Sequence, residues 1–375
     1  MFQACGSEVE FRPLVELRLW FTNQSRFGIG TVADRVEFHH FKVVRSNLGK
    51  VPRFKYKNYN HKASYFTSEF QMSSPTVFVC GATGTQGGAL IDHLLKTDVK
   101  IHAVTRTPNS DAAQLLKSLG VLITEGDFDD DSVKKAMANC TSLFLNLMPA
   151  LTNLNASLKQ ACRLLKIAKE VGIKQVIYAS GLSANDPQRL KLWDPTSIIS
   201  EMMLNKHAIE NEIRKAGFEN WTILRPGNFM NNYLSPKTMM YPGFTKTGVF
   251  TTAFAPDTLL PMVDPNDIGQ FAAAAVLDPV KFNHQEIEIA SELLGIEATI
   301  QTLSRATGRE MSVAYMSDEE INAQKATNPF IAGQLMARDL RSFVDLDKVK
   351  AWNIPLGTFE QFLQREKSKV DATYL

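Results

Sequence analysis

A glycine-rich segment between a strand pattern and a helix pattern constrains this chain more than any other feature. An apolar run over residues 76–80 leads into Gly81, Gly84 and Gly87, and an amphipathic run follows over 89–96. A helix that begins at such a turn offers free backbone N–H groups and the positive end of its dipole to an anion. We therefore expect a strand, a turn and a helix that hold the pyrophosphate of a dinucleotide.

Each glycine has its own expected role. Gly81 permits the tight turn out of the strand, Gly84 lets the backbone approach the phosphates, and Gly87 lets the helix pack closely on the sheet. The resulting spacing, G-x-x-G-x-x-G, differs from the G-x-G-x-x-G of common dehydrogenases. The residues between the glycines belong to the same expected cofactor site, namely Thr83, Thr85 and Gln86.

The composition is that of a globular protein with reduced cysteines. Hydrophobic residues make up 44% and charged residues 21% of the 375 positions, which is enough for a sizeable core. The cysteines show no metal-ligand or C-x-x-C spacing, so we expect free thiols and a cytoplasmic or nuclear location. No apolar run approaches membrane-spanning length, and the chain lacks a secretory signal pattern. The histidines and carboxylates form no ligand-spaced cluster, so we expect no metal.

Residues 1–71 are more basic than the rest of the chain. They hold 11 Lys and Arg against 6 Asp and Glu, whereas the other residues hold 30 against 33. Bases alternate with aromatics at 41–45 and 53–59, as in a nucleic-acid arm or an organelle leader. However, this segment also carries acidic residues, and Met72 stands directly before the first strand. We expect 1–71 to be a disordered or mispredicted extension, with a tethering arm as the alternative, and no direct nucleic-acid binding.

From residue 75 onward, short apolar runs alternate with amphipathic helices, which is the pattern of repeated βαβ units. We expect strands at 76–80, 100–105, 121–125, 142–147, 175–179 and 221–224. Helices are expected between them, at 110–119, 132–138, 154–171 and 195–216. We predict an α/β fold in which a Rossmann-like, doubly wound parallel sheet occupies mainly 72–225. A smaller C-terminal α/β region, mainly 226–375 with interleaved boundaries, should bind a substrate or partner, and it contains a strand at 286–290 and a capping box at 317–320.

The end of the second strand bears on the choice of cofactor. An NAD site places a carboxylate there, whereas a guanidinium pairs with the 2′-phosphate of NADP. Arg106 stands at this position, and no acidic residue is nearer in sequence than Asp111. We predict NADP(H) as the preferred cofactor and NAD(H) as the alternative; a solvated surface arginine is the other interpretation of Arg106. Asn146, Met148 and Pro149 follow the fourth strand and should line the nicotinamide ribose.

Four separated motifs resemble the NmrA-like family of atypical short-chain dehydrogenases. They are the glycine-rich turn and the segments at 126–130, 224–232 and 263–269. The resemblance covers about residues 74–367 and implies a nicotinamide cofactor. It also implies contacts to the adenine from Asp127 and Phe128, while Asp129 or Asp131 would cap the following helix. Two residues of the third motif join the expected cofactor contacts, Pro226 and Asn228.

The candidate catalytic residues depart from the usual pattern at one position. Ordinary short-chain dehydrogenases pair a Tyr with a Lys four residues later and a Ser on the preceding strand, because the ammonium lowers the pKa of the proton-donating Tyr. Ser180 and Lys206 occupy two of these places, but Met202 occupies the third, and a thioether is no acid. Ser180 and Lys206 are the candidate catalytic residues. Lys206 either acts as the acid, as in the related isoflavone-reductase-like enzymes, or binds the nicotinamide ribose.

The expected pocket follows the fifth and sixth strands. Its candidate residues are Trp193, Phe229, Met230 and Tyr233. Such a lining suits a small planar molecule or a docking partner, but it equally suits a core between the two regions.

The resemblance implies two functions, because the family contains both enzymes and regulators. The missing Tyr slightly favours a regulator that senses the redox state of NADP(H) and acts through a protein partner such as a transcription regulator. The alternative is an NADPH-dependent reductase of a quinone, an enone or a similar small apolar substrate.

Overall fold

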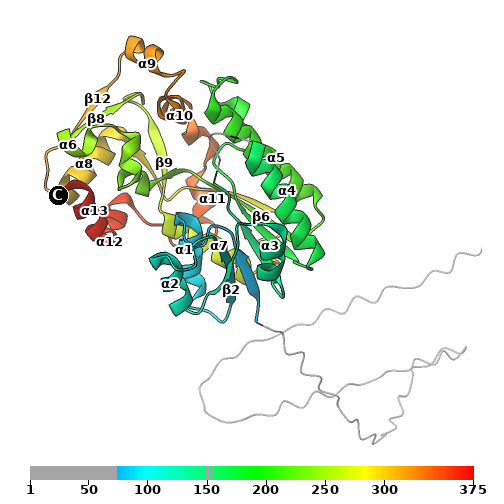
Figure 1. Ribbon diagram of the computed structural model, residues 1–375. Helices are drawn as coiled ribbons and strands as arrows, with labels where there is room; N and C mark the ends of the chain where they lie inside the picture. Colours follow the sequence, from blue (N-terminus) through cyan, green and yellow to red (C-terminus); the bar gives the residue numbers. More distant parts are fainter. Residues whose placement is uncertain (1–73, 149–152, 154) are drawn as a thin grey trace, which may run out of the picture. The chain divides into compact units, whose positions relative to one another are not determined.

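The computed structural model describes residues 74–148, 153 and 155–375, which all belong to one compact unit (Figure 1). The expected extension 1–71 and Pro149 lie outside the described residues. None of the helices in the described part of the chain is both long and apolar enough to cross a membrane.

A seven-stranded parallel sheet forms the centre of this unit. In spatial order its strands are β10 (Gln285–Ile289), β6 (Asn220–Pro226), β5 (Gln175–Ala179), β4 (Ser142–Leu145), β1 (Thr76–Val79), β2 (Lys100–Thr105) and β3 (Leu122–Glu125). The predicted Rossmann-like fold is confirmed. The direction of winding reverses between β1 and β4, and dinucleotides bind at this switch point in sheets of this type.

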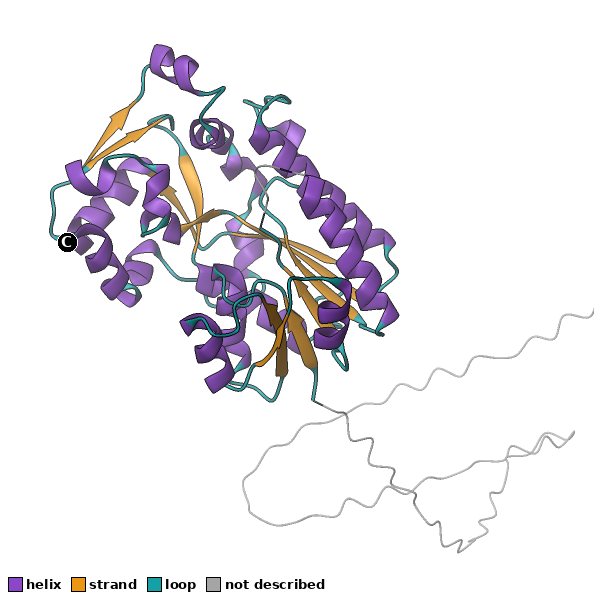
Figure 2. Ribbon diagram, in the orientation of Figure 1, coloured by secondary structure: helices purple, strands orange, loops and turns teal. Residues whose placement is uncertain are grey.

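Helices cover both faces of the sheet, as Figure 2 shows. Alternate side chains of β1 and the next residue supply the two cores: Val77 and Val79 pack in one cluster, Phe78 and the following Cys80 in the other. The first cluster includes side chains of α1 (Thr85–Leu94), α2 (Asp111–Ser118) and α7 (Pro265–Leu277). The second includes side chains of α3 (Asp130–Met137), α4 (Asn155–Glu170) and α5 (Ile198–Lys215).

The predicted helix ends differ from the observed ones for local reasons. Helix α5 begins at Ile198 rather than at 195, because the Ser197 hydroxyl caps it by accepting from the N–H of Ile199 at 3.2 Å. Gly172 and Gly217 follow α4 and α5 with φ of +86° and +69°, so glycine ends both helices.

After β6 the chain forms two smaller sheets and a group of short helices. One sheet joins β7 (Asn228–Phe229), β9 (Leu259–Val263) and β11 (Glu292–Gly295), and the other joins β8 (Val249–Thr252) and β12 (Ser312–Tyr315). The remaining α-helices are α6 (Phe244–Thr247), α8 (Ile296–Thr307), α9 (Asp318–Gln324), α10 (Pro329–Ala337), α11 (Leu346–Lys350), α12 (Phe359–Arg365) and α13 (Lys367–Tyr374). The 3-10 helices are η1 (Pro187–Arg189), η2 (Met230–Tyr233), η3 (Lys237–Met240) and η4 (Leu340–Phe343). The capping box at the start of α9 is confirmed.

Helix α7 lies directly against α1. A Cβ at Gly269 would lie 2.4 Å from the backbone oxygen of Ala89, so only glycine permits this approach. A hydrogen bond between His93 Nε2 and Asn266 Oδ1, 3.0 Å long, joins the same two helices. The helix that follows the glycine-rich turn is therefore fixed by α7.

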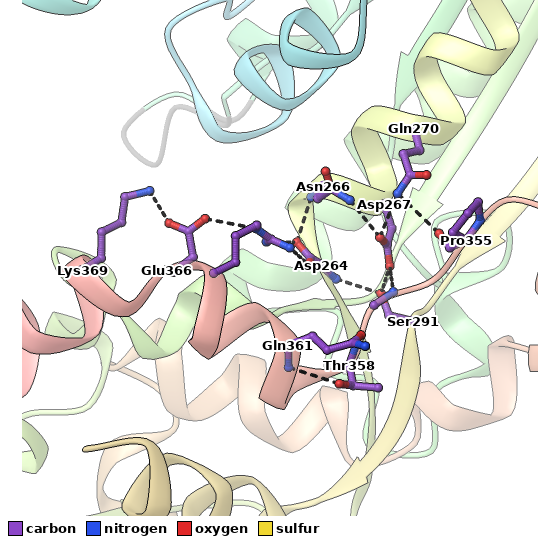
Figure 3. A network of polar contacts seen from close by, with 12 residues as sticks. Asp264, Asn266, Asp267, Gln270, Ser291, Pro355, Thr358, Gln361, Glu366 and Lys369 are labelled. Carbon is purple, nitrogen blue, oxygen red and sulfur yellow. Dashed lines mark hydrogen bonds and ion pairs between the residues drawn. The ribbon is translucent and has the colours of Figure 1, made fainter. Parts of the chain in front are cut away.

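The start of α7 also holds the C-terminal segment, through the polar network in Figure 3. The fully buried Asp264 caps α7 and accepts from both terminal nitrogens of Arg365, at 2.8 Å each. Asp267 accepts from Ser291 Oγ at 2.6 Å and from the N–H of Gly357 at 2.8 Å, and burial raises the pKa of its carboxyl. The motif at 263–269 thus has a structural role.

Replacement of Arg365 tests this network. Arg365→Met should lower the free energy of unfolding by about 3 kcal/mol, because it leaves a buried carboxylate without its guanidinium. The matched control is Lys369→Met, which removes a largely exposed ammonium that pairs with Glu366. It should change the free energy by less than about 0.5 kcal/mol. Urea unfolding measures both, and equal losses would contradict the structural role.

Candidate functional site

The glycine-rich turn closes tightly between β1 and α1. Gly81 has φ of +67°, which confirms its predicted role in the turn, and its carbonyl accepts from the N–H of Gly84 at 2.9 Å. A Cβ at Gly87 would lie 2.2 Å from the Gly81 oxygen and 2.7 Å from its carbonyl carbon. Gly87 therefore permits close approach to the backbone of the turn itself, rather than to the sheet as we predicted.

The start of α1 fits a dinucleotide in two respects. The N-cap residue, Gly84, has no side chain to bond the first N–H groups, and the first turn contains no acidic residue. No capping side chain or carboxylate of the first turn would therefore compete with an anion for these donors. Gln86 Nε2 donates to Asn146 Oδ1 at 3.1 Å. The Oε1 atom of Gln86 is buried, and among the described residues it has no hydrogen-bond donor. A hydroxyl of a bound ligand would satisfy it.

Arg106 and Asp127 lie side by side at the ends of β2 and β3. The distance from Arg106 Nε to Asp127 Oδ1 is 3.7 Å, and both side chains are largely exposed. The sequence showed no acidic residue near Arg106, but the pairing of adjacent parallel strands brings one there. An exposed pair of this kind is weak and can rearrange. The edge therefore offers a guanidinium for a 2′-phosphate and a carboxylate for ribose hydroxyls.

The segment after β3 combines an unusual backbone with a helix cap. Phe128 has φ of +56°, and its half-buried ring packs against the second core cluster. Asp129 caps α3 by accepting from the N–H of Ser132 at 2.9 Å. Of the two residues that we considered for this cap, Asp129 is the one that forms it.

The other predicted cofactor residues follow several different strands. Thr83 is exposed, and Met148 is 88% exposed after β4. Pro226 is buried at the end of β6. The Nδ2 atom of Asn228 contacts Met262 Sδ at 3.3 Å. Thr83, Met148 and Pro226 thus lie at or just after the carboxyl ends of β1, β4 and β6, and Asn228 begins β7.

Lys206 and Ser180 meet, but not through the serine hydroxyl. Lys206 Nζ donates to the backbone oxygen of Ser180 at 3.0 Å and lies 6.0 Å from the centre of the Tyr178 ring. Burial lowers the pKa of Lys206 to about 8, although the nearby Glu210 acts in the opposite direction. Ser180 is buried, and its Oγ donates to Glu210 Oε1 at 2.6 Å. The serine hydroxyl thus bonds to Glu210, whereas Lys206 bonds to the serine carbonyl.

Glu210, which the sequence analysis missed, connects this pair to a buried ion network. Its carboxylate is fully buried and accepts from Arg225 Nε at 2.9 Å and Nη2 at 2.6 Å, and from Arg214 Nη2 at 3.0 Å. Arg225 also pairs with Glu286, and with Glu288 at 2.9 Å. Glu210 lies four residues after Lys206, on the same face of α5. This spacing was the sequence signal that could have identified Glu210 as a neighbour of Lys206.

The four predicted pocket residues separate in the structure. Met230 and Tyr233 are fully buried in the third core cluster, where Tyr233 stacks with Tyr241 at 5.8 Å. They form core, so we no longer expect them to contact a ligand. Phe229 is half-buried. Trp193 lines a cavity of about 360 Å³ that also involves α9 and α10.

A second, much smaller cavity lies beside Lys206. Its volume is about 10 Å³, and its lining includes Met202, Tyr178 and Leu147. This is room for about one water molecule. Within residues 74–148, 153 and 155–375, no group of three or more His, Cys, Asp or Glu side chains could hold a metal ion.

Comparison with known proteins gives a family match over most of the chain. The profile of the NmrA-like family matches residues 73–363. The NmrA-like family domain-containing oxidoreductase malD of Malbranchea aurantiaca is 27% identical over 257 residues, which are 62% of this chain and 73% of the relative. The corresponding oxidoreductase himF of Aspergillus japonicus is 26% identical over 256 residues, 64% of this chain and 76% of the relative.

Solved structures show the same fold. The NADPH-dependent quinone oxidoreductase QOR2 of Escherichia coli, solved with NADPH, has a TM-score of 0.62 at 20% identity and covers 77% of this chain and 99% of its own. The negative transcriptional regulator NmrA, solved with NAD, has a TM-score of 0.58 at 18% identity and covers 80% of this chain and 95% of its own.

Two neighbouring glycines provide a matched test of the turn. Gly87→Ala should lower stability and abolish dinucleotide binding, because the new Cβ would clash with rigid backbone. Gly88→Ala is the control, since its Cβ would lie 3.7 Å from the nearest atom, and it should raise the free energy of unfolding by up to about 1 kcal/mol. Thermal unfolding and calorimetric titration with NADP⁺ measure both effects. Wild-type affinity in Gly87→Ala would contradict the geometry.

Proposed function

The chain belongs to the NmrA-like family, and on that premise we propose that it is an NADPH-dependent reductase of a small, planar, electrophilic substrate such as a quinone or an enone. The environment of Lys206 carries this proposal. Its ammonium stands at the carboxyl edge of the sheet with a pKa lowered to about 8, which suits a proton donor near neutral pH. The names of the curated relatives, which are oxidoreductases, and of QOR2 support the same class of reaction.

In the proposed reaction, Lys206 supplies the proton and its neighbours hold it in place. Bound NADPH would supply a hydride, which leaves the acceptor with a negative charge on oxygen. Lys206 Nζ donates a proton to that oxygen, and the Ser180 carbonyl orients the ammonium. The small cavity beside Lys206 has room for the water that returns the proton to Nζ. Met202 cannot take part, because a thioether carries no proton to give.

The pH dependence of turnover tests the role of Lys206. The rate of NADPH oxidation with a quinone should be flat below pH 8 and fall about tenfold per pH unit above it, because only the ammonium form can donate. Lys206→Ala should lower kcat by about 10² to 10⁴-fold. Lys215→Ala, on an exposed part of the same helix, is the control and should retain the rate. Turnover that survives Lys206→Ala would reject this role.

The preference for NADP(H) belongs to the same proposal and depends on Arg106. Arg106→Glu should remove the preference for NADP⁺ over NAD⁺, because it replaces the partner of the 2′-phosphate with a like charge. Asp127→Asn should have the opposite effect and increase the preference, since it frees the guanidinium from its neighbour. Calorimetric titration with both nucleotides measures the ratio, and an unchanged ratio in both variants would reject the assignment.

A second candidate function has a specific observation in its favour. Met202 replaces the usual Tyr, and the Ser180 hydroxyl donates to Glu210, so one of the three groups of the ordinary reaction is missing and a second is already engaged. A regulator that reads the redox state of NADP(H) for a protein partner needs neither group. It requires unequal affinity for the two forms, and a tenfold gap corresponds to about 1.4 kcal/mol. Titration with NADP⁺ and NADPH, followed by quinone, enone and aldehyde acceptors, separates the two functions.

A further inference from the structure

Lys237, at the start of η3, is linked to the glycine-rich turn by a single amide. Lys237 Nζ donates to Asn231 Oδ1 at 3.3 Å, and Asn231 Nδ2 donates to Thr85 Oγ1 at 3.3 Å. The ammonium can only donate, so it fixes the orientation of the Asn231 amide. Thr85 is the first residue of α1. Lys237 is therefore held near the end of the helix that the dinucleotide would approach, although it lies more than 150 residues away in sequence.

The charge of Lys237 is poorly compensated at this position. Its side chain is half-buried, Nζ lies 5.3 Å from the centre of the Phe229 ring, and burial lowers its pKa. In the part of the chain that the structure describes, no carboxylate forms an ion pair with it. A partly desolvated cation without a counter-ion is costly. The positive end of the α1 dipole is also an unfavourable place for a second positive charge.

An anion bound between the Lys237 ammonium and the start of α1 would offset both unfavourable effects. We propose that Lys237 is a further cofactor-binding residue, whose ammonium pairs with the pyrophosphate of the dinucleotide. The inference rests on the proposed function. The free N–H groups at the start of α1 would bind one side of the pyrophosphate, and Lys237 would supply the formal positive charge that backbone groups lack. The Asn231 amide and the Phe229 ring hold the lysine in place.

Two ligands distinguish this role from a general structural one. NADP⁺ contains both the 2′-phosphate and the pyrophosphate, whereas 2′-AMP contains only the former. In calorimetric titrations of the full chain, Lys237→Met should weaken NADP⁺ binding by about tenfold to a hundredfold and leave 2′-AMP binding unchanged. Arg106→Met should weaken both ligands. Lys237→Arg should retain most of the NADP⁺ affinity, and Lys246→Met, an exposed lysine on α6, should retain all of it.

Several results would overturn the inference. Wild-type affinity for NADP⁺ in Lys237→Met would do so, because the charge would then contribute nothing. An equal loss for NADP⁺ and 2′-AMP would also do so, since it indicates a disturbed fold, and thermal unfolding of the ligand-free variant would confirm that cause. If the wild-type chain binds neither NADP⁺ nor NADPH, the proposed function itself fails. If the wild-type chain binds NADP⁺ and Lys237→Met binds it equally well, only the role of Lys237 fails.

Discussion

The buried ion pair between Glu210 and Arg225 determines where the candidate catalytic groups stand. One carboxylate on α5 accepts from the guanidinium on β6 and from the hydroxyl of Ser180, the residue after β5, so three parts of the chain meet at a single group. The Ser180 carbonyl in turn holds the Lys206 ammonium. Loss of Arg225 would leave the buried Glu210 carboxylate paired only with Arg214 among the described guanidinium groups, and breaking a buried ion pair in this way is destabilising. The position of Lys206 thus depends on an interaction that touches no ligand.

Local chemistry explains why much of the fold was predictable. The strands of the main sheet alternate with helices whose ends carry glycine or a capping side chain, and each of these signals extends over only a few residues. The turn at Gly81 and the caps at Asp129 and Ser317 follow from such short-range rules. The start of α5 was misplaced by three residues because Ser197, rather than the proline before it, supplies the cap.

Most of the contacts that could not be predicted join residues that are distant in sequence. Arg106 meets Asp127 only because β2 and β3 are neighbours, and Asn231 meets Thr85 across 146 positions of sequence. The burial of Met230 and Tyr233 belongs to the same class, since an aromatic and methionine-rich segment has the same composition whether it lines a pocket or fills a core. The sequence showed that Met202 stands where the usual Tyr would be, but it did not show which group would replace the Tyr as proton donor.

The contact between α1 and α7 has a mechanical consequence. The backbones touch at Gly269 and Ala89, and the N-terminus of α7 is fastened to the C-terminal segment through Asp264 and Asp267. Packed interfaces of this kind shift as rigid bodies rather than deform continuously. A displacement of α1 would therefore carry α7 and the attachment point of the last two helices with it. A continuous series of contacts through α1 and α7 thus joins the glycine-rich turn to the C-terminal helices without passing through Lys206.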